Sequence, residues 1–166
     1  MAAPGGNGRV VILLGSKTDL EFRGAIARAL DRFGIAHETR IGSAHRVTAY
    51  LLDLLAEYED VREPLVYITV AGRSNALSGV VDANSLHPVI ACPPYSERYA
   101  GMDLLSTVRM PGGVAPLLVL EPETAALAAA KILAVADPAL RERIGAWREG
   151  QREQALADDR EARGTD

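Results

Sequence analysis

The chain of 166 residues has little cysteine, few aromatic residues and no long apolar run. Its single cysteine, Cys92, excludes an internal disulfide framework and is typical of a reducing compartment, so we expect a cytoplasmic protein. No segment approaches the roughly 20 apolar residues that a membrane-spanning helix needs, and we expect no membrane partner. Residues 1–8 combine no basic residues with no apolar core, which predicts neither a signal peptide nor an anchor.

Charge of one sign is not concentrated anywhere in the sequence. The 18 Lys and Arg residues and 22 Asp and Glu residues give a net charge of -4 without a basic tract, so we expect no nucleic-acid partner. A phosphate site therefore has to be local and built from a few donors. The hydrophobic share of 48% suits a single globular core. We predict one domain over residues 9–157, with flexible tails at 1–8 and 158–166.

Apolar runs alternate with amphipathic segments along the chain. Thr18 and Glu21 have capping-box spacing at the start of the first amphipathic segment, and Gly34 is expected to end that helix. This alternation predicts an α/β fold, with an open, mostly parallel sheet of about five strands between two helical layers. Strands are expected at 9–14, 36–41, 65–70, 88–91 and 115–120, and helices at 18–33, 47–58, within 72–84, and at 100–108, 123–136 and 138–157.

The last expected helix, 138–157, carries only scattered apolar residues. Its stripe consists of Leu140, Ile144, Trp147 and Leu156. A long helix with so thin a stripe more often packs on another subunit than on its own core. We therefore expect a C-terminal helical extension and a homo-oligomer.

Three polar loops each follow a predicted strand, which places them at the carboxyl edge of the sheet, where ligands bind in α/β folds. The first, Gly15 to Asp19, offers backbone N–H groups and hydroxyls to a phosphate, or is only a helix cap. The third, Ala71 to Gly79, offers Arg73, Ser74 and an amide donor, or is only a turn before a helix. Taken jointly, the three loops favour an anionic small molecule.

The second loop, Ser43-Ala44-His45-Arg46, brings a hydroxyl, an imidazole and a guanidinium within four residues. His45 is the candidate general base, because imidazole titrates near neutrality and here stands beside an arginine at an expected helix start. A lone histidine is more often structural, and we expect that role for His37 and His87.

Together these motifs resemble the PurE family of purine biosynthesis, from about Val10 to Trp147. The resemblance lies in the GSxxD opening, the Ser-Ala-His-Arg corner, the AGRSNALSG loop, the ACPP turn and the MPGG loop. It implies a flavodoxin-like fold and a homo-oligomer, commonly an octamer. It also implies an enzyme that interconverts 5-aminoimidazole ribonucleotide (AIR) and its 4-carboxylated product (CAIR).

The resemblance also implies roles for particular residues. Ser16, Asp19, Ser43 and Arg46 would hold the ribose phosphate, with Asp19 on the ribose hydroxyls. Gly72 and Ser74 would orient CO2 or the new carboxylate, and His45 would move the proton. No metal, biotin or other cofactor is implied.

Two branches of the family differ in the third loop. Gly72-Arg73-Ser74-Asn75, without a loop histidine, resembles class II enzymes, which carboxylate AIR with CO2 directly. Arg46 and the MPGG loop look more like class I, which rearranges N5-carboxy-AIR, so that reaction is the first alternative. A non-enzymatic module that binds a phosphorylated ligand is the second, although binding alone needs no base at His45.

Overall fold

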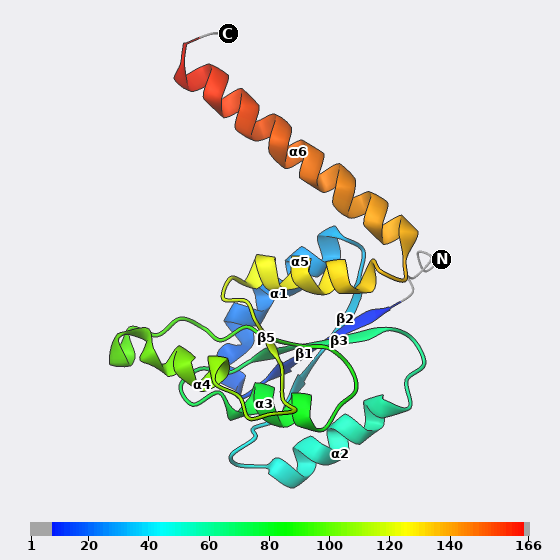
Figure 1. Cartoon of the computed structure of the whole chain (residues 1–166), viewed down its shortest axis with the longest axis vertical. Helices are drawn as coiled ribbons and strands as arrows, with labels where there is room; N and C mark the ends of the chain where they lie inside the picture. The colour runs from blue at the N-terminus through cyan, green and yellow to red at the C-terminus, as the bar shows by residue number, and fades with distance from the viewer. Residues whose placement is uncertain (1–7, 165–166) are drawn as a thin grey trace.

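A computed structural model describes residues 8–164 and contains a sheet of five parallel strands (Figure 1). Their order is β2-β1-β3-β4-β5, so the first strand lies inside the sheet. The second strand is added on one side of β1, and the later strands are added on the other side. This confirms the expected α/β fold with a parallel sheet of about five strands. The strands are β1 (Arg9–Leu14), β2 (Ala36–Ile41), β3 (Leu65–Val70), β4 (Val89–Ala91) and β5 (Leu117–Leu118).

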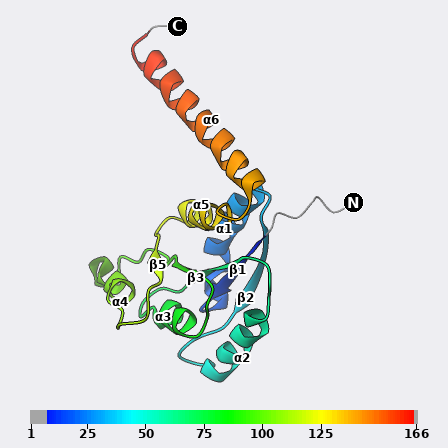
Figure 2. The same cartoon turned by 45° about the vertical axis from the view of Figure 1, so that its right-hand side comes forward.

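Helices cover both faces of the sheet and make the domain three layers thick (Figures 1 and 2). One face carries α1 (Leu20–Arg32) and α5 (Pro122–Leu133). The other carries α2 (Thr48–Glu59) and α3 (Ala76–Ala83). Since side chains alternate across a strand, Val10 and Ile12 enter the first core, whereas Val11 and Leu13 enter the second. Strands β1 and β3, which have helices on both faces, are therefore apolar at nearly every position.

Helix α1 buries the stripe expected from its spacing and ends where the sequence predicts. Ile26, Ala29, Leu30 and Phe33 are all at most 2% exposed. Gly34 follows with φ of 65°, a left-handed conformation that glycine adopts without steric cost. The predicted helix end is confirmed.

Several expected elements have different bounds in the structure, and three of them lie between residues 98 and 136. The strand expected at 115–120 is limited to β5, because Pro116 has no N–H to donate to a ladder. The helix expected at 100–108 divides into a 3-10 helix, η2 (Arg98–Leu104), and a short α4 (Leu105–Val108). The helix expected at 123–136 is α5, which begins with Pro122 at its first turn, a position that proline favours.

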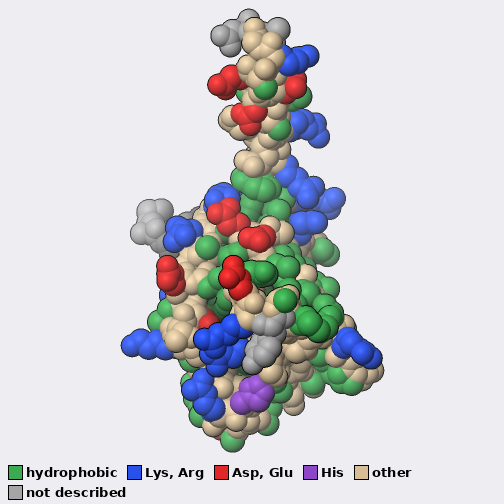
Figure 3. All heavy atoms as spheres, turned by 90° about the vertical axis from the view of Figure 1, so that its left-hand side faces the viewer, with side chains coloured by type: hydrophobic (Ala, Val, Ile, Leu, Met, Phe, Trp, Pro, Cys, Tyr) green, Lys and Arg blue, Asp and Glu red, His purple; other side chains and the backbone are tan. Residues whose placement is uncertain are grey.

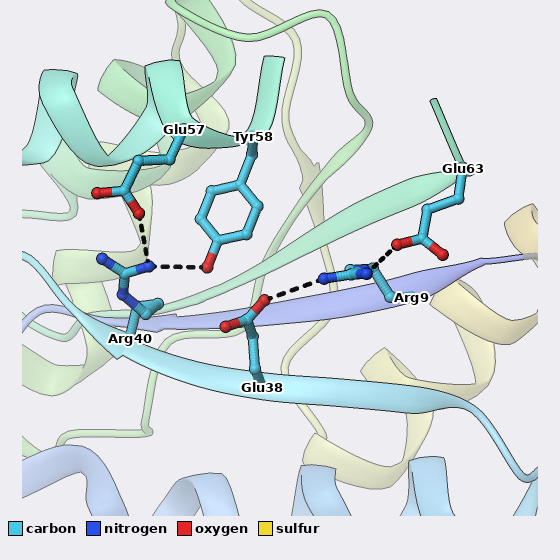
Figure 4. Close-up of polar contacts among 6 residues, drawn as sticks. All are labelled: Arg9, Glu38, Arg40, Glu57, Tyr58 and Glu63. Carbon is cyan, nitrogen blue, oxygen red and sulfur yellow. Dashed lines mark hydrogen bonds and ion pairs between the residues drawn. The ribbon is translucent and has the colours of Figure 1, made fainter. Parts of the chain in front are cut away.

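Strand β2 lies at an edge of the sheet and carries polar side chains that form ion pairs and hydrogen bonds (Figure 4). Arg9 on β1 pairs with Glu38 at 3.5 Å and also with Glu63. Arg40 on β2 donates to the Glu57 carboxylate at 2.9 Å and to the Tyr58 hydroxyl at 3.0 Å. These contacts tie β2 to β1 and α2 where apolar burial is incomplete.

The last helix, α6 (Pro138–Ala162), packs on the domain only through its first turns and then extends away from it (Figures 1 and 2). Leu140 and Ile144 join the core, and the Trp147 ring meets Phe33 edge-on at 5.7 Å. The helix continues past Ala157 through residues that we expected to form a tail. A hydrogen bond of 2.7 Å from Gln154 to Asp158, four residues apart, supports this extra turn.

The expected tails fall partly outside the described residues, which leave out 1–7 and 165–166. Gly8, assigned to the N-terminal tail, is buried against Pro64 and Leu133. Among residues 8–164, no helix combines the length and apolar character that crossing a membrane requires.

Candidate active site

The three polar loops meet at the carboxyl edge of the sheet, around a pocket of about 800 Å³. All seven residues proposed from the sequence line this pocket. They are Ser16, Asp19, Ser43, His45, Arg46, Gly72 and Ser74. Figure 3 shows the side of the molecule that lies at the left of Figure 1, where Lys and Arg side chains gather beside a histidine.

Backbone hydrogen bonds continue the sheet into these loops and hold their first residues together. The Gly15 N–H donates to the Val70 carbonyl at 2.8 Å, and the Gly42 N–H donates to the Leu14 carbonyl at 2.9 Å. A Cβ on Gly15 would lie 3.1 Å from the Cβ of Ala71, so the first and third loops are in close contact. The parallel ladder thus brings together segments far apart in the sequence.

The first loop forms a short 3-10 helix, η1 (Lys17–Asp19), before α1. Its capping box joins Ser16 and Asp19, and this corrects the expected pair Thr18 and Glu21. The Thr18 N–H donates to Ser16 Oγ at 3.1 Å, and the Ser16 N–H donates to Asp19 Oδ2 at 3.0 Å. The box lies earlier because the 3-10 turn starts directly after β1, which the spacing alone did not indicate.

Asp19 keeps its carboxylate at the pocket wall at an electrostatic cost. Burial raises the pKa of Asp19 above its ordinary value of 3.8, and the hydrogen bond from the Ser16 N–H only partly opposes this rise. The site therefore retains a carboxylate where desolvation disfavours its charge.

The second loop is a turn that precedes α2. The Arg46 and Val47 N–H groups donate to the Ser43 carbonyl at 3.3 and 3.0 Å, and Thr48 Oγ1 donates to the Ala44 carbonyl at 2.5 Å. His45 is exposed in this turn, and α2 begins only at Thr48. The helix was expected to begin at Val47 and begins one residue later, so His45 stands three residues before it. The turn presents both His45 and Arg46 to the pocket.

The other two histidines have structural contacts away from the pocket. His37 pairs with Asp31 at 3.1 Å. His87 Nε2 lies 3.2 Å from the Tyr58 carbonyl oxygen, and its ring is 6.2 Å from that of Tyr67. No such side-chain hydrogen bond engages His45 within residues 8–164, which leaves its imidazole available to a ligand.

A fourth loop, after β4, also lines the pocket and was missing from our site assignment. It contributes Pro94, Tyr95, Ser96 and Arg98. The signal was available, because this loop also follows a parallel strand and so lies at the same edge. Cys92 lies just before it, is buried, and faces the Leu120 carbonyl at 3.6 Å. Burial raises the pKa of the Cys92 thiol to about 12, so it stays protonated and is a poor nucleophile at neutral pH.

Positive charge is concentrated in the pocket although the whole chain is acidic. Four cationic side chains line it, against the single carboxylate of Asp19. No ion pair in the described part of the chain involves any of them: Lys17, Arg46, Arg73 and Arg98. Such a site attracts an anion. The described residues contain no cluster of His, Cys, Asp and Glu suited to a metal ion.

A parallel sheet of order β2-β1-β3-β4-β5, with a polar pocket at the carboxyl ends of its strands, defines a flavodoxin-like protein with a small-molecule site. Comparison with known proteins narrows this class. The family model described as AIR carboxylase matches residues 9–154. The chain therefore belongs to the AIR carboxylase family.

Individual relatives agree with this assignment. A phosphoribosylaminoimidazole carboxylase of Archaeoglobus fulgidus is 50% identical over 155 residues, which cover 93% of this chain and 85% of that protein. A Treponema denticola protein of the same name is 45% identical and covers 90% of this chain and 94% of its own length. The crystal structure of Treponema denticola PurE superposes with a TM-score of 0.91 at 44% identity and covers 93% of this chain and 98% of that one.

Proposed function

We propose that this protein catalyses the reversible carboxylation of AIR at C4 by CO2 to give CAIR in purine biosynthesis, without metal or biotin. The observation that carries the proposal is the pocket itself. It combines His45 and four cations, none of which has an ion-pair partner within residues 8–164, with the Gly72-Arg73-Ser74 loop. The cations suit an anionic substrate, and His45 suits the proton that must be moved. The third loop suits CO2, which carries no charge.

The cations and hydroxyls of the first two loops suit a ribose phosphate. Ser16, Ser43 and Arg46 supply hydroxyl and guanidinium donors to the pocket. Asp19 suits the ribose hydroxyls, because a carboxylate accepts hydrogen bonds from hydroxyls and repels a phosphate. The aminoimidazole ring is then held between His45 and the third loop.

The chemistry asked of this pocket is the formation of one carbon–carbon bond and the loss of one proton. C4 of AIR behaves as an enamine carbon, and its electron pair attacks the carbon of CO2, which becomes a carboxylate. The proton left on C4 passes to His45, and the ring recovers its aromaticity. In the reverse direction His45 returns the proton to C4 as CO2 leaves. A well-placed general base contributes about 100- to 10,000-fold to such a step.

Rearrangement of N5-carboxy-AIR is the second candidate, and Arg46 is the observation that favours it. By resemblance, the direct carboxylases often have lysine at this position. A planar guanidinium and a compact ammonium present different donors to a ligand, so the two residues are not equivalent. The MPGG loop, Met110 to Gly113, points the same way.

A paired assay decides between the two reactions. One arm supplies AIR with bicarbonate as the source of CO2, and the other supplies N5-carboxy-AIR free of AIR and CO2. We expect CAIR to form from AIR in proportion to dissolved CO2. Turnover of N5-carboxy-AIR alone would establish the rearrangement instead, and binding of both substrates without turnover would establish a non-enzymatic module.

We also propose that the protein is a cytoplasmic homo-oligomer, an octamer by family resemblance. The part of α6 beyond Trp147 has no core of its own, and Leu156 on it is 54% exposed. A second copy of the chain would cover this residue. Light scattering that gives the mass of one 17.7 kDa chain would refute the oligomer.

A further inference from the structure

The third loop contains an unusual backbone conformation at the pocket wall. Arg73 has φ of 62°, in the left-handed region that residues other than glycine rarely occupy. Strain of this kind persists only where the surrounding structure enforces it, and it is concentrated at functional sites. Arg73 also borders a second cavity of about 470 Å³, which adjoins the main pocket.

The residue that enforces this conformation comes from α4, more than thirty positions away in the sequence. Ser106 Oγ accepts a hydrogen bond from the Asn75 N–H at 3.0 Å. The hydroxyl proton of Ser106 faces two carbonyl oxygens, that of Asp103 at 2.7 Å and that of Arg73 at 3.3 Å. One hydroxyl therefore holds the backbone on both sides of Ser74.

Asn75 holds the same loop through hydrogen bonds to α3 and α4. Its side chain is 2% exposed, and its Nδ2 donates to Thr107 Oγ1 at 3.0 Å. Its Oδ1 accepts from the Ser78 N–H at 3.3 Å and so caps α3. Asn75 and Ser106 together join the third loop to α3 and α4. We call these two residues the clamp.

The geometry points to the clamp as a positioning device that directs the Arg73 guanidinium toward the carboxylate of CAIR. This inference rests on the proposed function. Arg73 stands between Gly72 and Ser74 at the pocket wall and has no carboxylate partner within residues 8–164. A guanidinium forms two parallel hydrogen bonds with a carboxylate, and the held backbone sets the direction in which the Arg73 side chain leaves the loop. AIR lacks this carboxylate and CAIR has it, so the clamp favours CAIR.

A double-mutant cycle tests the assignment. Arg73→Asn removes the guanidinium, and asparagine is among the residues that best tolerate the left-handed conformation. Ser106→Ala removes the clamp hydroxyl. We expect each single change to raise the KM for CAIR about tenfold and to alter the KM for AIR about twofold or less. In the double variant, Ser106→Ala should have a much smaller effect than in the parent protein, because the main group that it positions is gone.

Two further variants separate positioning from general damage. Ser106→Thr keeps the hydroxyl and should restore the KM for CAIR. Ser85→Ala is the matched control, since the Ser85 hydroxyl donates to Glu59 at 2.5 Å, at the opposite edge of the sheet. It should leave both KM values unchanged. Additive effects of Arg73→Asn and Ser106→Ala would overturn the positioning role, as would equal KM changes for AIR and CAIR.

Hydrogen exchange tests the clamp without any turnover. In Ser106→Ala, the Asn75 amide loses its acceptor, so we expect faster exchange at that amide than in the parent protein and in Ser85→Ala. Unchanged exchange would overturn the clamp. If the parent protein converts neither AIR nor CAIR, the proposed function and the carboxylate assignment both fail, while exchange at Asn75 still decides whether the clamp exists.

Discussion

Arginines on neighbouring strands β1 and β2 and arginines in the pocket differ in one respect, which is whether the protein itself neutralises them. Arg9 and Arg40 contact Glu38, Glu57 and Glu63, and the Tyr58 hydroxyl adds another acceptor (Figure 4). Within residues 8–164 the pocket cations have no such partners, and they share the pocket with a single carboxylate.

The two regions therefore have different roles, one in stability and one in binding. Partners of Arg40 come from α2, so that network holds an edge strand onto the domain. The pocket cations repel one another until an anion neutralises them, so the fold loses stability there in exchange for a binding site. The histidines follow the same division, because His37 and His87 have partners and His45 has none within residues 8–164.

We expect the largest change in kcat to distinguish His45, which has no side-chain partner within residues 8–164, from His87, which has one. His45→Asn removes the proposed base and should lower kcat by about 100- to 10,000-fold, with little change in the KM for AIR. His87→Asn, which disturbs a contact with Tyr58, should lower the melting temperature and leave kcat near the parent value. Steady-state kinetics and thermal unfolding measure both. Substantial residual activity in His45→Asn would remove it from the mechanism.

An intermediate effect should separate the two kinds of arginine. Arg46→Ala should raise the KM for AIR at least about tenfold, because a charged hydrogen bond to phosphate is lost. The KM of the parent protein should also rise with salt, since ions screen the pocket cations. Arg40→Ala should instead lower the free energy of unfolding by about 1 kcal/mol without changing KM. If the two variants gave the same result, the division between paired and unpaired arginines would have no functional meaning.

The smallest effect concerns the one carboxylate of the pocket. Burial raises the pKa of Asp19, so folding favours its protonated form and this contribution is lost as pH rises through the folded-state pKa. Asp19→Asn should therefore raise the melting temperature at neutral pH. The difference should shrink toward zero below the ordinary pKa of 3.8. Activity should fall because the amide has one acceptor oxygen where the carboxylate has two, and the Ser16 N–H competes with the ribose for it. A melting temperature that falls at neutral pH would show that the carboxylate stabilises the domain.

The layered fold, and the edge of the sheet at which the site lies, can be predicted from the residues. Apolar runs such as Val10 to Leu14 and the stripe of α1 are decided by local periodicity, so they could be identified from the residues alone. The seven proposed site residues share one pocket because parallel strands bring their carboxyl ends to one edge. Loops that follow strands can therefore be assigned to a common site without coordinates.

Contacts between distant loops could not be predicted in this way and depend on the folded arrangement of the strands. Nothing local in the sequence indicates that Ser106 holds the backbone beside Ser74, or that Asn75 contacts Thr107. The capping box at Ser16 and the extra turn of α6 likewise depended on backbone geometry at element ends, where residue preferences are weak. Patterns with a period specify elements, whereas single long-range hydrogen bonds leave no pattern and form only when the sheet has brought their partners together.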